Sequence, residues 1–405
     1  EMLSESTVPS EGVDVYLHLP FCYRLCTFCG CNIRITSDQT ETLPYVDGLI
    51  HEIKKVASYL QAGRIPLNSL FIGGGSPNFL PPEEFDRLLE AFYTVFNPQK
   101  DFRGTFEADP NLGIEEYLPL LKKHHLTHLT FGLQDTHEAI LANVNRPQKW
   151  ENIRELFDRL KKDETPFETN IDLIYGLPYQ TPHSIEKTFH DVLSLAPDHV
   201  AYYPLAHVPW QEKTQKAFGD FSPPSQEEKV ELYLSGKEEL KKQNYHLLGF
   251  GHFTREGSSL HNAFEDHSLR RTPMGYTPKR SSTLLAFGVS SIGYSEKWLW
   301  QNEKILKKYL LKVQQRNELP IYRAHQKTDW DREKARLFED VSTKKNVNLQ
   351  DYPLHFEHLS QLNERLAPLK KDGLILFNEE GVITIPTHGR NFLKSLCEAL
   401  DLSHP

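Results

Sequence analysis

The chain has no long apolar run. None of its apolar stretches approaches the roughly 18–20 residues that a membrane-spanning helix needs. Residues 1–14 are polar and acidic, and they lack the basic start and the apolar core of a secretory signal peptide. These two absences predict a cytoplasmic protein without a membrane span.

Positive charge is also scarce. The formal net charge is -9 at pH 7, because 46 Lys and Arg residues face 55 Asp and Glu residues. Proteins that bind nucleic acids usually carry a basic domain or stripe, since neutralising phosphates supplies most of their affinity. The composition therefore argues against a nucleic-acid partner and against docking on an anionic membrane surface.

The five cysteines are too few and too unevenly placed for a disulfide framework. Four of them lie between positions 22 and 31, and Cys397 stands alone near the end. A chain of 405 residues can bury a large core without covalent staples. The cluster therefore indicates metal or redox chemistry. Cys397 lies in an apolar helical pattern, and we expect it to be a small, buried hydrophobic residue.

Six short runs rich in Val, Ile, Phe, Thr and Tyr alternate with helical patterns. The predicted strands are 13–20, 69–75, 104–110, 128–134, 168–178 and 199–207, and the predicted helices are 42–61, 81–96, 113–125, 136–143, 149–164 and 182–195. This alternation predicts an α/β fold with a parallel sheet, either doubly wound or an incomplete barrel. Ligands bind at the carboxyl ends of such strands in both architectures.

The pattern changes after residue 210. A polar helix is predicted near 225–243, followed by an irregular stretch over 249–280 and an apolar run over 283–292. From about residue 301 the chain is predicted to be mainly helical, with a hairpin formed by 374–377 and 382–385. We therefore expect a catalytic domain over 1–300 and a mainly helical domain over 301–405. The helix–hairpin–helix order is loosely winged-helix-like, but neither flanking helix has the strongly basic face of a DNA-binding module.

The cysteine cluster follows the first predicted strand with the spacing Cys22-x3-Cys26-x2-Cys29-x-Cys31. Thiolates suit either zinc or an iron–sulfur cluster. Three thiolates would close three irons of a cubane and leave the fourth iron open to an outside ligand. Structural zinc sites with four cysteines usually join two Cys-x2-Cys knuckles a dozen or more residues apart. The compact spacing therefore favours iron–sulfur over zinc.

This motif, with the aromatic Phe28 just before its third cysteine and a six-fold strand–helix pattern around it, resembles the radical S-adenosylmethionine (SAM) superfamily. The resemblance implies a partial (β/α)6 barrel and a [4Fe–4S] cluster on Cys22, Cys26 and Cys29. It also implies that SAM chelates the open iron and is cleaved to a 5′-deoxyadenosyl radical, which abstracts a hydrogen atom.

Further stretches resemble one branch, the HemN-type oxygen-independent coproporphyrinogen III oxidases. They occur in order at 16–32, 73–77, 107–110, 132–135, 145–146, 170–178, 206–209, 252–253, 275–277 and 288–292. The most discriminating residue is Cys31. Members of this branch have a cysteine there, whereas related haem chaperones and methyltransferases usually carry an aromatic residue.

The resemblance assigns roles position by position. It implies a first SAM at Tyr16, Gly74, Gly75, Glu107 and Ile292. It implies a second SAM at Phe28, Gly75, Ser76, Gln134, Arg146, Asp172 and Ala206. Cys31 and Tyr16 are the catalytic candidates, and we expect Cys31 not to bind the cluster. Taken singly, each of these residues would be read as core, rim or capping, so that only their joint order indicates a site.

The implied reaction is oxidative decarboxylation of two propionates of coproporphyrinogen III to give protoporphyrinogen IX, a step of haem and porphyrin biosynthesis. It needs the tetrapyrrole substrate and an electron donor and an electron acceptor of unknown identity, and we expect the enzyme to be a monomer. The anionic substrate calls for cations, and the candidates are Arg24, Arg34, Arg270, Arg271, Lys279 and Arg280.

Two features depart from the branch. Only fifteen residues precede Tyr16, and Gly251 stands where the branch has an aspartate before its His-Phe pair. They keep a second hypothesis open, a HemN-like methyltransferase or another radical enzyme acting on another substrate. A third hypothesis is a haem chaperone that keeps the cluster without turnover, although Cys31 argues against it.

Overall fold

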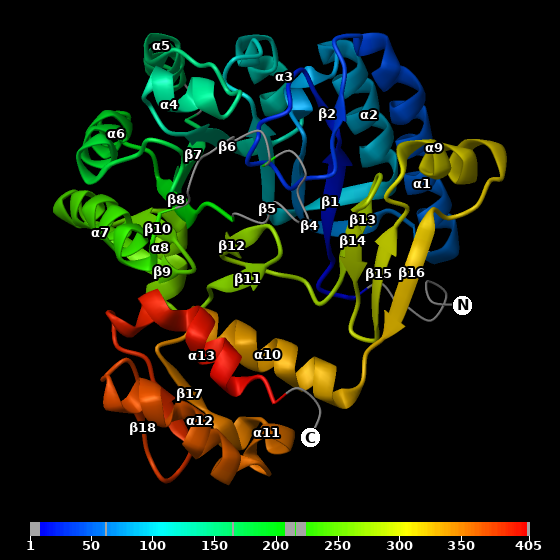
Figure 1. Ribbon diagram of the computed structural model, residues 1–405. Coiled ribbons are helices and arrows are strands. Elements are labelled where there is room, and N and C mark those ends of the chain that lie inside the picture. The colour runs from blue at the N-terminus through cyan, green and yellow to red at the C-terminus, as the bar shows by residue number, and fades with distance from the viewer. Residues whose placement is uncertain (1–8, 61–62, 164–165, 207–214, 216–223, 403–405) are drawn as a thin grey trace. The chain divides into compact units, whose positions relative to one another are not determined.

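The computed structural model describes residues 9–60, 63–163, 166–206, 215 and 224–402 (Figure 1). The chain divides into two compact units. Unit 1 comprises Glu1–Asp198, Pro204–Glu239 and Ser281–Gln326, and unit 2 comprises His199–Tyr203, Leu240–Arg280 and Lys327–Pro405. Each unit is a group of segments that pack together in space, and both units are built from separate parts of the chain. The division at residue 300 into a catalytic and a helical domain therefore stays a prediction.

Unit 1 contains five parallel strands in chain order across one sheet, running from blue to green in Figure 1. They are β1 (Val13–Leu19), β4 (Ile65–Gly74), β5 (Phe96–Ala108), β6 (Leu126–Gln134) and β7 (Glu168–Tyr175). A doubly wound sheet would reverse its strand order at a switch point. The unbroken order is that of a barrel-type sheet, which confirms the predicted α/β class.

Helices follow these strands as the sequence predicts. They are α1 (Thr42–Leu60), α2 (Pro82–Val95), α3 (Leu118–Lys123), α4 (Glu138–Asn143), α5 (Trp150–Lys161) and α6 (Pro182–Ser194), and β8 (His199–Pro204) supplies the sixth predicted strand. Side chains alternate across each strand. Phe106 of β5 meets Phe85 of α2 with ring centroids 5.3 Å apart, and Phe131 of β6 meets Phe157 of α5 at 5.3 Å. The neighbours of these residues, Glu107 among them, therefore point to the opposite, inner face of the sheet.

The sheet of unit 1 extends beyond β1. The strand β13 (Leu284–Phe287) runs parallel to β1, and β14 (Ile292–Tyr294), β15 (Trp298–Asn302) and β16 (Ile321–Gln326) continue antiparallel. The predicted polar helix is α7 (Gln226–Lys242), and α9 (Leu306–Leu310) precedes β16. The strand β16 lies in a region that was predicted to be helical. Five of its six residues are exposed, so its sequence lacks the apolar alternation of a half-buried strand.

Unit 2 begins with an antiparallel sheet in which β10 (His252–Arg255) pairs with both β8 and β9 (Tyr245–Gly249). The helix α8 (Ser259–Glu265) and the pair β11 (Arg270–Thr272) and β12 (Gly275–Thr277) occupy the stretch predicted to be irregular. The later elements are α10 (Asp329–Thr343), β17 (Asn346–Asn348), α11 (Pro353–Phe356), α12 (Leu359–Lys371), β18 (Leu376–Phe377), β19 (Val382–Thr384) and α13 (Leu393–Leu400). The predicted hairpin is thus β18–β19.

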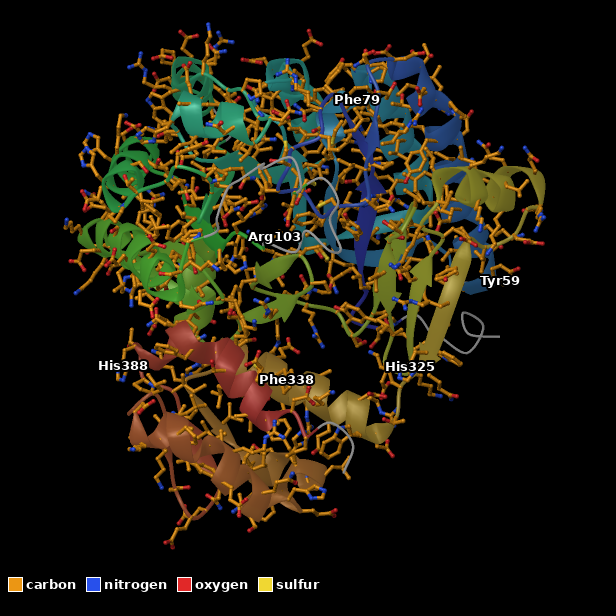
Figure 2. All side chains as sticks on the ribbon, in the orientation of Figure 1. Tyr59, Phe79, Arg103, His325, Phe338 and His388 are labelled. Carbon is orange, nitrogen blue, oxygen red and sulfur yellow. The ribbon has the colours of Figure 1, made fainter. Side chains whose placement is uncertain are left out.

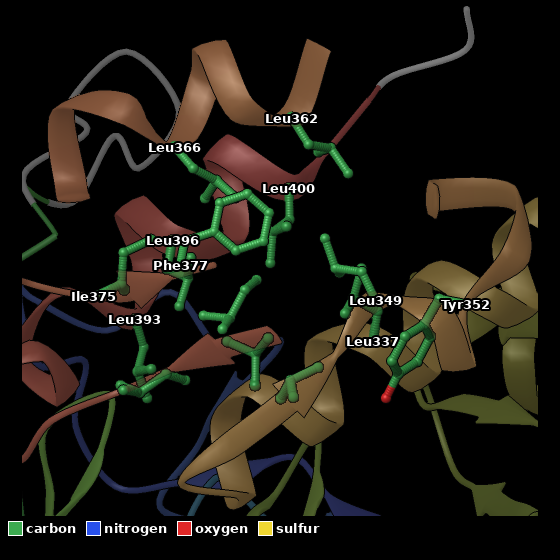
Figure 3. Packing of buried hydrophobic residues seen from close by; sticks show 14 of the residues in the cluster. Leu337, Leu349, Tyr352, Leu362, Leu366, Ile375, Phe377, Leu393, Leu396 and Leu400 are labelled. Carbon is green, nitrogen blue, oxygen red and sulfur yellow. The ribbon is translucent and has the colours of Figure 1, made fainter. Parts of the chain in front are cut away.

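An apolar core holds the last part of unit 2 together (Figure 3). Leu337 of α10, Leu366 of α12, Phe377 of β18 and Leu400 of α13 all contribute to it. Cys397 packs against the same core as expected, but it is only partly buried, whereas its apolar helical pattern predicts a buried residue. No helix among the described residues is long and apolar enough to cross a lipid bilayer.

Candidate active site

The cysteines lie on the loop that leaves β1, and short strand pairing closes the base of this loop. The strands β2 (Phe21–Cys22) and β3 (Arg34–Ile35) run parallel, and the Thr36 N–H donates to the Cys22 carbonyl at 3.1 Å. Farther out, the Thr27 N–H donates to the carbonyl of Val144 at 3.1 Å. Tyr23 packs on Phe79, a side chain marked in Figure 2, with ring centroids 4.4 Å apart. The loop is therefore held at its base and at its tip.

A pocket of about 490 Å³ opens beside this loop, at the carboxyl ends of the parallel strands. All four clustered cysteines line it together with residues in or just after the carboxyl-terminal halves of β4, β5, β6 and β7. The predicted site residues among its lining are Cys22, Cys26, Phe28, Cys29, Cys31, Gly74, Gly75, Ser76, Glu107, Gln134, Arg146 and Asp172. The structure thus brings residues separated by up to 150 positions into one pocket, as the rule for parallel strands predicts.

The glycines after β4 allow the backbone to approach the cysteine loop. The Gly75 N–H donates to the Leu19 carbonyl at 2.8 Å. A Cβ added at Gly75 would lie 2.6 Å from the carbonyl oxygen of Phe21 and 2.9 Å from the Cys22 sulfur. Gly74 has a φ of +117°, a backbone conformation that favours glycine. This close approach is the reason for the glycine run.

Two carboxyl groups line the pocket where solvent is scarce. Burial raises the pKa of Glu107 to about 7, while the Gly74 N–H, 3.0 Å from its Oε2, opposes that rise. Burial likewise raises the pKa of Asp172 to about 6, against the hydrogen bond that Asn170 Nδ2 donates at 2.8 Å. Carboxylates that lack water are stabilised by a cation. The pair therefore suits a ligand that brings positive charge.

Arg146 is the buried cation of this pocket. Its Nη2 donates to the Gly132 carbonyl at 2.6 Å and lies 3.7 Å from Asp109 Oδ1. Its Nη1 lies 3.6 Å from the Cys26 sulfur. Its Nε is buried and has no hydrogen-bond partner among the described residues, which leaves one donor of the guanidinium unused. Arg24 also lines the pocket, and its side chain is exposed.

Comparisons with known proteins agree with this geometry. Residues 16–192 match the family described as the radical SAM superfamily. The oxygen-independent coproporphyrinogen III oxidase of Cereibacter sphaeroides is 31% identical over 98% of this chain and 88% of its own length. The protein of that name from Escherichia coli is 32% identical over 97% of this chain and 86% of its own length.

The chain belongs to the radical SAM superfamily, in its HemN-type branch. A solved structure supports the assignment, described as coproporphyrinogen III oxidase (HemN) from Escherichia coli, a radical SAM enzyme. It matches with a TM-score of 0.92 at 30% identity, over 100% of this chain and 93% of that chain. The predicted superfamily and branch are thereby confirmed.

Membership of the radical SAM superfamily implies a [4Fe–4S] cluster and SAM, and the pocket residues fit both. Three thiols on one loop face the pocket, and a fourth lies beside them. Burial raises the pKa of Cys22 to about 12, so this thiol keeps its proton until a metal replaces it. No three His, Cys, Asp or Glu side chains in the described ranges are arranged to hold a single metal ion.

Three predicted site residues are not in the pocket lining. The Tyr16 hydroxyl lies 2.9 Å from His18 Nδ1, and burial, followed by the charges of Glu107 and Cys31, raises the pKa of Tyr16 well above its usual range. Ile292 is 45% exposed on β14. The Ala206 carbonyl accepts a hydrogen bond from Gln215 Nε2 at 2.7 Å, and residues 207–209 of the same predicted stretch lie outside the described residues. Their roles stay predictions.

Of the six cations that the sequence proposes for the anionic substrate, one lines the pocket. Arg24 lines the pocket, whereas Arg34 forms an ion pair with Glu41 at 3.0 Å. The other four, Arg270, Arg271, Lys279 and Arg280, belong to unit 2, where Arg280 pairs with Glu339 at 2.9 Å. The structure therefore makes Arg24 the candidate that is most directly available in unit 1.

The sequence interpretation assigned no separate role to His18 or to Asp109, although they lie in the resembling stretches 16–32 and 107–110. His18 Nε2 lies 2.9 Å from the Asn32 carbonyl, so this ring joins β1 to the end of the cysteine loop. The signal for it was its spacing, because Tyr16 and His18 share one face of β1. Asp109 lines the pocket and faces Arg146, but a carboxylate after a strand is too common to be recognised by itself.

Proposed function

We propose that this protein is an oxygen-independent coproporphyrinogen III dehydrogenase, which converts two propionate side chains of coproporphyrinogen III into vinyl groups to give protoporphyrinogen IX. The observation that supports this most is Cys31, the discriminating residue of the branch, which lines the same pocket as Cys22, Cys26 and Cys29. The similarity to coproporphyrinogen oxidases over nearly the whole chain adds to it.

When bound, the reduced cluster and SAM supply a 5′-deoxyadenosyl radical. In the proposed reaction one hydrogen atom is abstracted from the β-carbon of a propionate and is incorporated into 5′-deoxyadenosine. The substrate radical then loses CO2 and one electron, and the new double bond is the vinyl group. The electron leaves to an acceptor, and a donor must reduce the cluster for each turnover. Both partners belong to the proposal, as does the tetrapyrrole substrate.

The residues of the pocket would bind and orient these molecules, since the cofactor itself carries the reactivity. Cys22, Cys26 and Cys29 would hold the cluster. Glu107 would accept hydrogen bonds from the first SAM, together with Tyr16, Gly74, Gly75 and Ile292. Charge-assisted hydrogen bonds of this kind are about twice as strong as neutral ones.

A second SAM is part of the proposal. Arg146 would pair its carboxylate and Asp172 its amino group, with Phe28, Gly75, Ser76, Gln134 and Ala206 around it. Arg146 has a buried Nε without a partner among the described residues, as a residue awaiting a ligand would. Asp172 faces the same pocket.

The test is an anaerobic turnover assay. The protein is reconstituted with iron and sulfide, and then receives dithionite, SAM and coproporphyrinogen III. Chromatography with mass detection follows 5′-deoxyadenosine, methionine and the porphyrin, and the variant Cys22→Ser serves as the control without a complete cluster. We expect 5′-deoxyadenosine to form and the porphyrin to lose two CO2. Formation of 5′-deoxyadenosine with an untouched porphyrin would overturn the substrate and keep the enzyme class.

A second candidate, a HemN-like methyltransferase or other radical enzyme on another substrate, is favoured by Gly251. This residue lies in the turn between β9 and β10 with a φ of +75°, where a Cβ would collide with the Tyr202 carbonyl oxygen. An aspartate would be strained in this turn as the structure has it. If this second candidate is correct, the porphyrin would stay untouched in the assay, and S-adenosylhomocysteine and a methylated product would form only after the other substrate is supplied.

A further inference from the structure

Two side chains of the pocket point hydrogen-bond donors at cysteine sulfurs that would hold the cluster. The Nη1 of Arg146 lies 3.6 Å from the Cys26 sulfur, and the Ser76 hydroxyl lies 3.6 Å from the Cys22 sulfur. The Arg146 side chain is 13% exposed and Ser76 is 7% exposed. Both donors are therefore poorly screened by water, and one of them carries a full positive charge.

The position of Arg146 is fixed by the surrounding chain. Its backbone N–H donates to the Leu141 carbonyl at 2.9 Å, and its Nη2 donates to the Gly132 carbonyl at 2.6 Å. The guanidinium also lies 3.7 Å from Asp109. Because the side chain is anchored by the end of α4 and by β6, it stays next to the Cys26 sulfur without help from a ligand.

Asp109 is equally well placed. Its backbone N–H donates to Asn78 Oδ1 at 2.9 Å, and its Oδ1 accepts from the Asn111 N–H at 3.0 Å and from Asn111 Nδ2 at 2.9 Å. The carboxylate thus faces the guanidinium in a defined arrangement. The positive charge of Arg146 and the negative charge of Asp109 therefore both lie close to the cysteines that would hold the cluster.

Hydrogen bonds to the sulfurs, net charge and burial set the reduction potential of an iron–sulfur cluster. Reduction adds one negative charge, so a fixed cation beside a thiolate favours the reduced form and a fixed anion disfavours it. We propose that Arg146 raises the reduction potential of the cluster through its N–H to the Cys26 sulfur, that Ser76 adds a smaller increment at Cys22, and that Asp109 opposes Arg146. This role is separate from any contact of Arg146 with SAM.

The inference rests on the cluster that the radical SAM superfamily implies, and not on the identity of the substrate. Its function would be to make the cluster reducible by a physiological donor before the substrate is bound. The test needs neither SAM nor a tetrapyrrole, so its result is independent of the turnover assay. A protein without decarboxylase activity could still confirm it.

The experiment is an anaerobic redox titration of the reconstituted protein without SAM, monitored by electron paramagnetic resonance of the reduced cluster. The variants are Arg146→Met, Arg146→Lys, Ser76→Ala and Asp109→Asn. The matched control is Arg159→Met, which removes one arginine from an exposed ion pair with Glu115. Iron and sulfide content are measured for each variant, so that potentials are compared only between fully loaded proteins.

We expect R146M to lower the ratio of reduced to oxidised cluster at a fixed potential by about tenfold, which for one electron corresponds to ~59 mV. R146K keeps the charge without the planar guanidinium, so its shift should be smaller. S76A should shift the potential in the same direction by less, because its donor is neutral. D109N should shift it in the opposite direction, and R159M should leave it unchanged.

An unchanged potential in fully loaded R146M would overturn the proposal. If R146M does not retain iron, S76A and D109N decide the question by the signs of their shifts. Shifts of the same sign in both would mean that packing and not charge sets the potential, which would also overturn it. If the wild-type protein takes up no cluster, both the cofactor assignment and this proposal are overturned.

Discussion

Cys31 differs from the other three pocket cysteines in its exposure. It is exposed, whereas Cys22, Cys26 and Cys29 are partly buried. The pKa of the Cys31 thiol is raised, chiefly by a hydrogen bond with Cys29 and then by burial of the thiol group within the pocket. Burial raises the pKa of the predicted ligand Cys22 as well, so the pKa does not distinguish Cys31 from a ligand. The role of Cys31 in turnover, without binding the cluster, stays a prediction.

The corresponding prediction concerns Cys31→Ser. The variant should keep its iron content and its SAM cleavage, while porphyrin turnover falls by about 10² or more, the range that a positioned proton-transfer group contributes. Iron analysis, 5′-deoxyadenosine and porphyrin products are measured together. Cys22→Ser is the comparison and should lose cluster and cleavage alike. Loss of iron from C31S would make Cys31 a ligand and contradict the prediction.

Glu107 leads to a pH prediction. Its pKa is raised to about 7, so the carboxyl is protonated below pH 7 and ionised above it. A ligand with an ammonium group prefers the ionised form. We therefore expect SAM affinity to rise up to tenfold per pH unit from pH 5.5 to about 7 and to level off above, as measured by equilibrium dialysis of the reconstituted protein.

The variant Glu107→Gln should remove this pH dependence and weaken SAM binding roughly 10- to 100-fold, because a hydrogen bond to a charged group contributes about 1.5–3 kcal/mol. A pH profile that persists in E107Q would assign the titration to another group. Asp172, whose pKa is raised to about 6 by burial, is the first alternative.

Single residues also show how far the sequence alone can lead. The roles predicted for the cysteines, for Glu107 and for Arg146 rest on the resemblance to the family, and the structure places all of these residues at one pocket. The contact of Ser76 and Arg146 with particular sulfurs could not be predicted, because it depends on the path of loops that are far apart in sequence. Residue types and spacings determine the chemistry that is available, whereas loop geometry determines which partner each group meets.

The glycine run after β4 brings two backbone segments close together, and this close approach leads to a further prediction. A methyl group at Gly75 would overlap the Phe21 carbonyl and crowd the Cys22 sulfur. Gly75→Ala should therefore cost about 1–3 kcal/mol in apoprotein stability, as overpacking does, and should reduce iron uptake. Denaturant unfolding and iron analysis measure the two effects. Gly63→Ala is the matched control, since no atom lies within 4 Å of an added Cβ there. Equal iron content in both variants would argue against a tight backbone approach.

A buried carboxyl group connects α1 with the segments around β13–β15 and α9. Glu52 is 2% exposed, and it accepts hydrogen bonds from the Gly288 N–H at 2.9 Å, from Asn302 Nδ2 at 2.6 Å and from the Tyr309 hydroxyl at 2.6 Å. Burial raises the pKa of Glu52 to about 7 despite these three donors. The folded protein thus binds a proton here more tightly than the unfolded chain does.

Stability should therefore fall as the pH rises from about 4.5 to about 7 and then level off, by ~3 kcal/mol at most. The measurement is denaturant unfolding of the apoprotein at pH 5 and pH 8. Glu52→Gln should remove most of this difference, whereas the change of the exposed Glu83 to Gln should keep it. An unaltered difference in E52Q would mean that Glu52 is ionised at both pH values or that other groups dominate.

Most elements of unit 1 could be predicted because they are long enough to show their period. The helix predicted over 42–61 is α1 at Thr42–Leu60, and the strand predicted over 128–134 lies within β6 at Leu126–Gln134. The stretch 249–280 was predicted to be irregular, yet it contains β10, α8, β11 and β12. Strands of three or four residues are stabilised by tertiary pairing, so their sequence alone carries too little alternation to reveal them.

The charges that line the pocket fit the cofactor better than the proposed substrate. The pocket lining has the cations Arg24 and Arg146 and the carboxyls Glu107, Asp109 and Asp172, so it does not favour a polyanion. It suits SAM, which has both an ammonium group and a carboxylate. The tetrapyrrole of the proposed reaction has four carboxylates, and these would need further cations beyond this lining.

The haem-chaperone alternative predicts that the cluster-loaded protein binds haem. Protein ligands of haem iron are chiefly His, Cys, Met and Tyr side chains. The pocket lining includes no histidine and no methionine, Tyr23 is packed on Phe79, and three of the four cysteines would already hold the cluster.

We therefore expect an absorbance titration of the loaded protein with haem to show no tight one-to-one binding. The apoprotein, whose cysteines hold no cluster, is the comparison, and weak binding to it alone would be adventitious thiol ligation. Stoichiometric haem binding by the loaded protein, without 5′-deoxyadenosine formation, would instead favour a carrier, because the cluster would then support haem binding and not turnover.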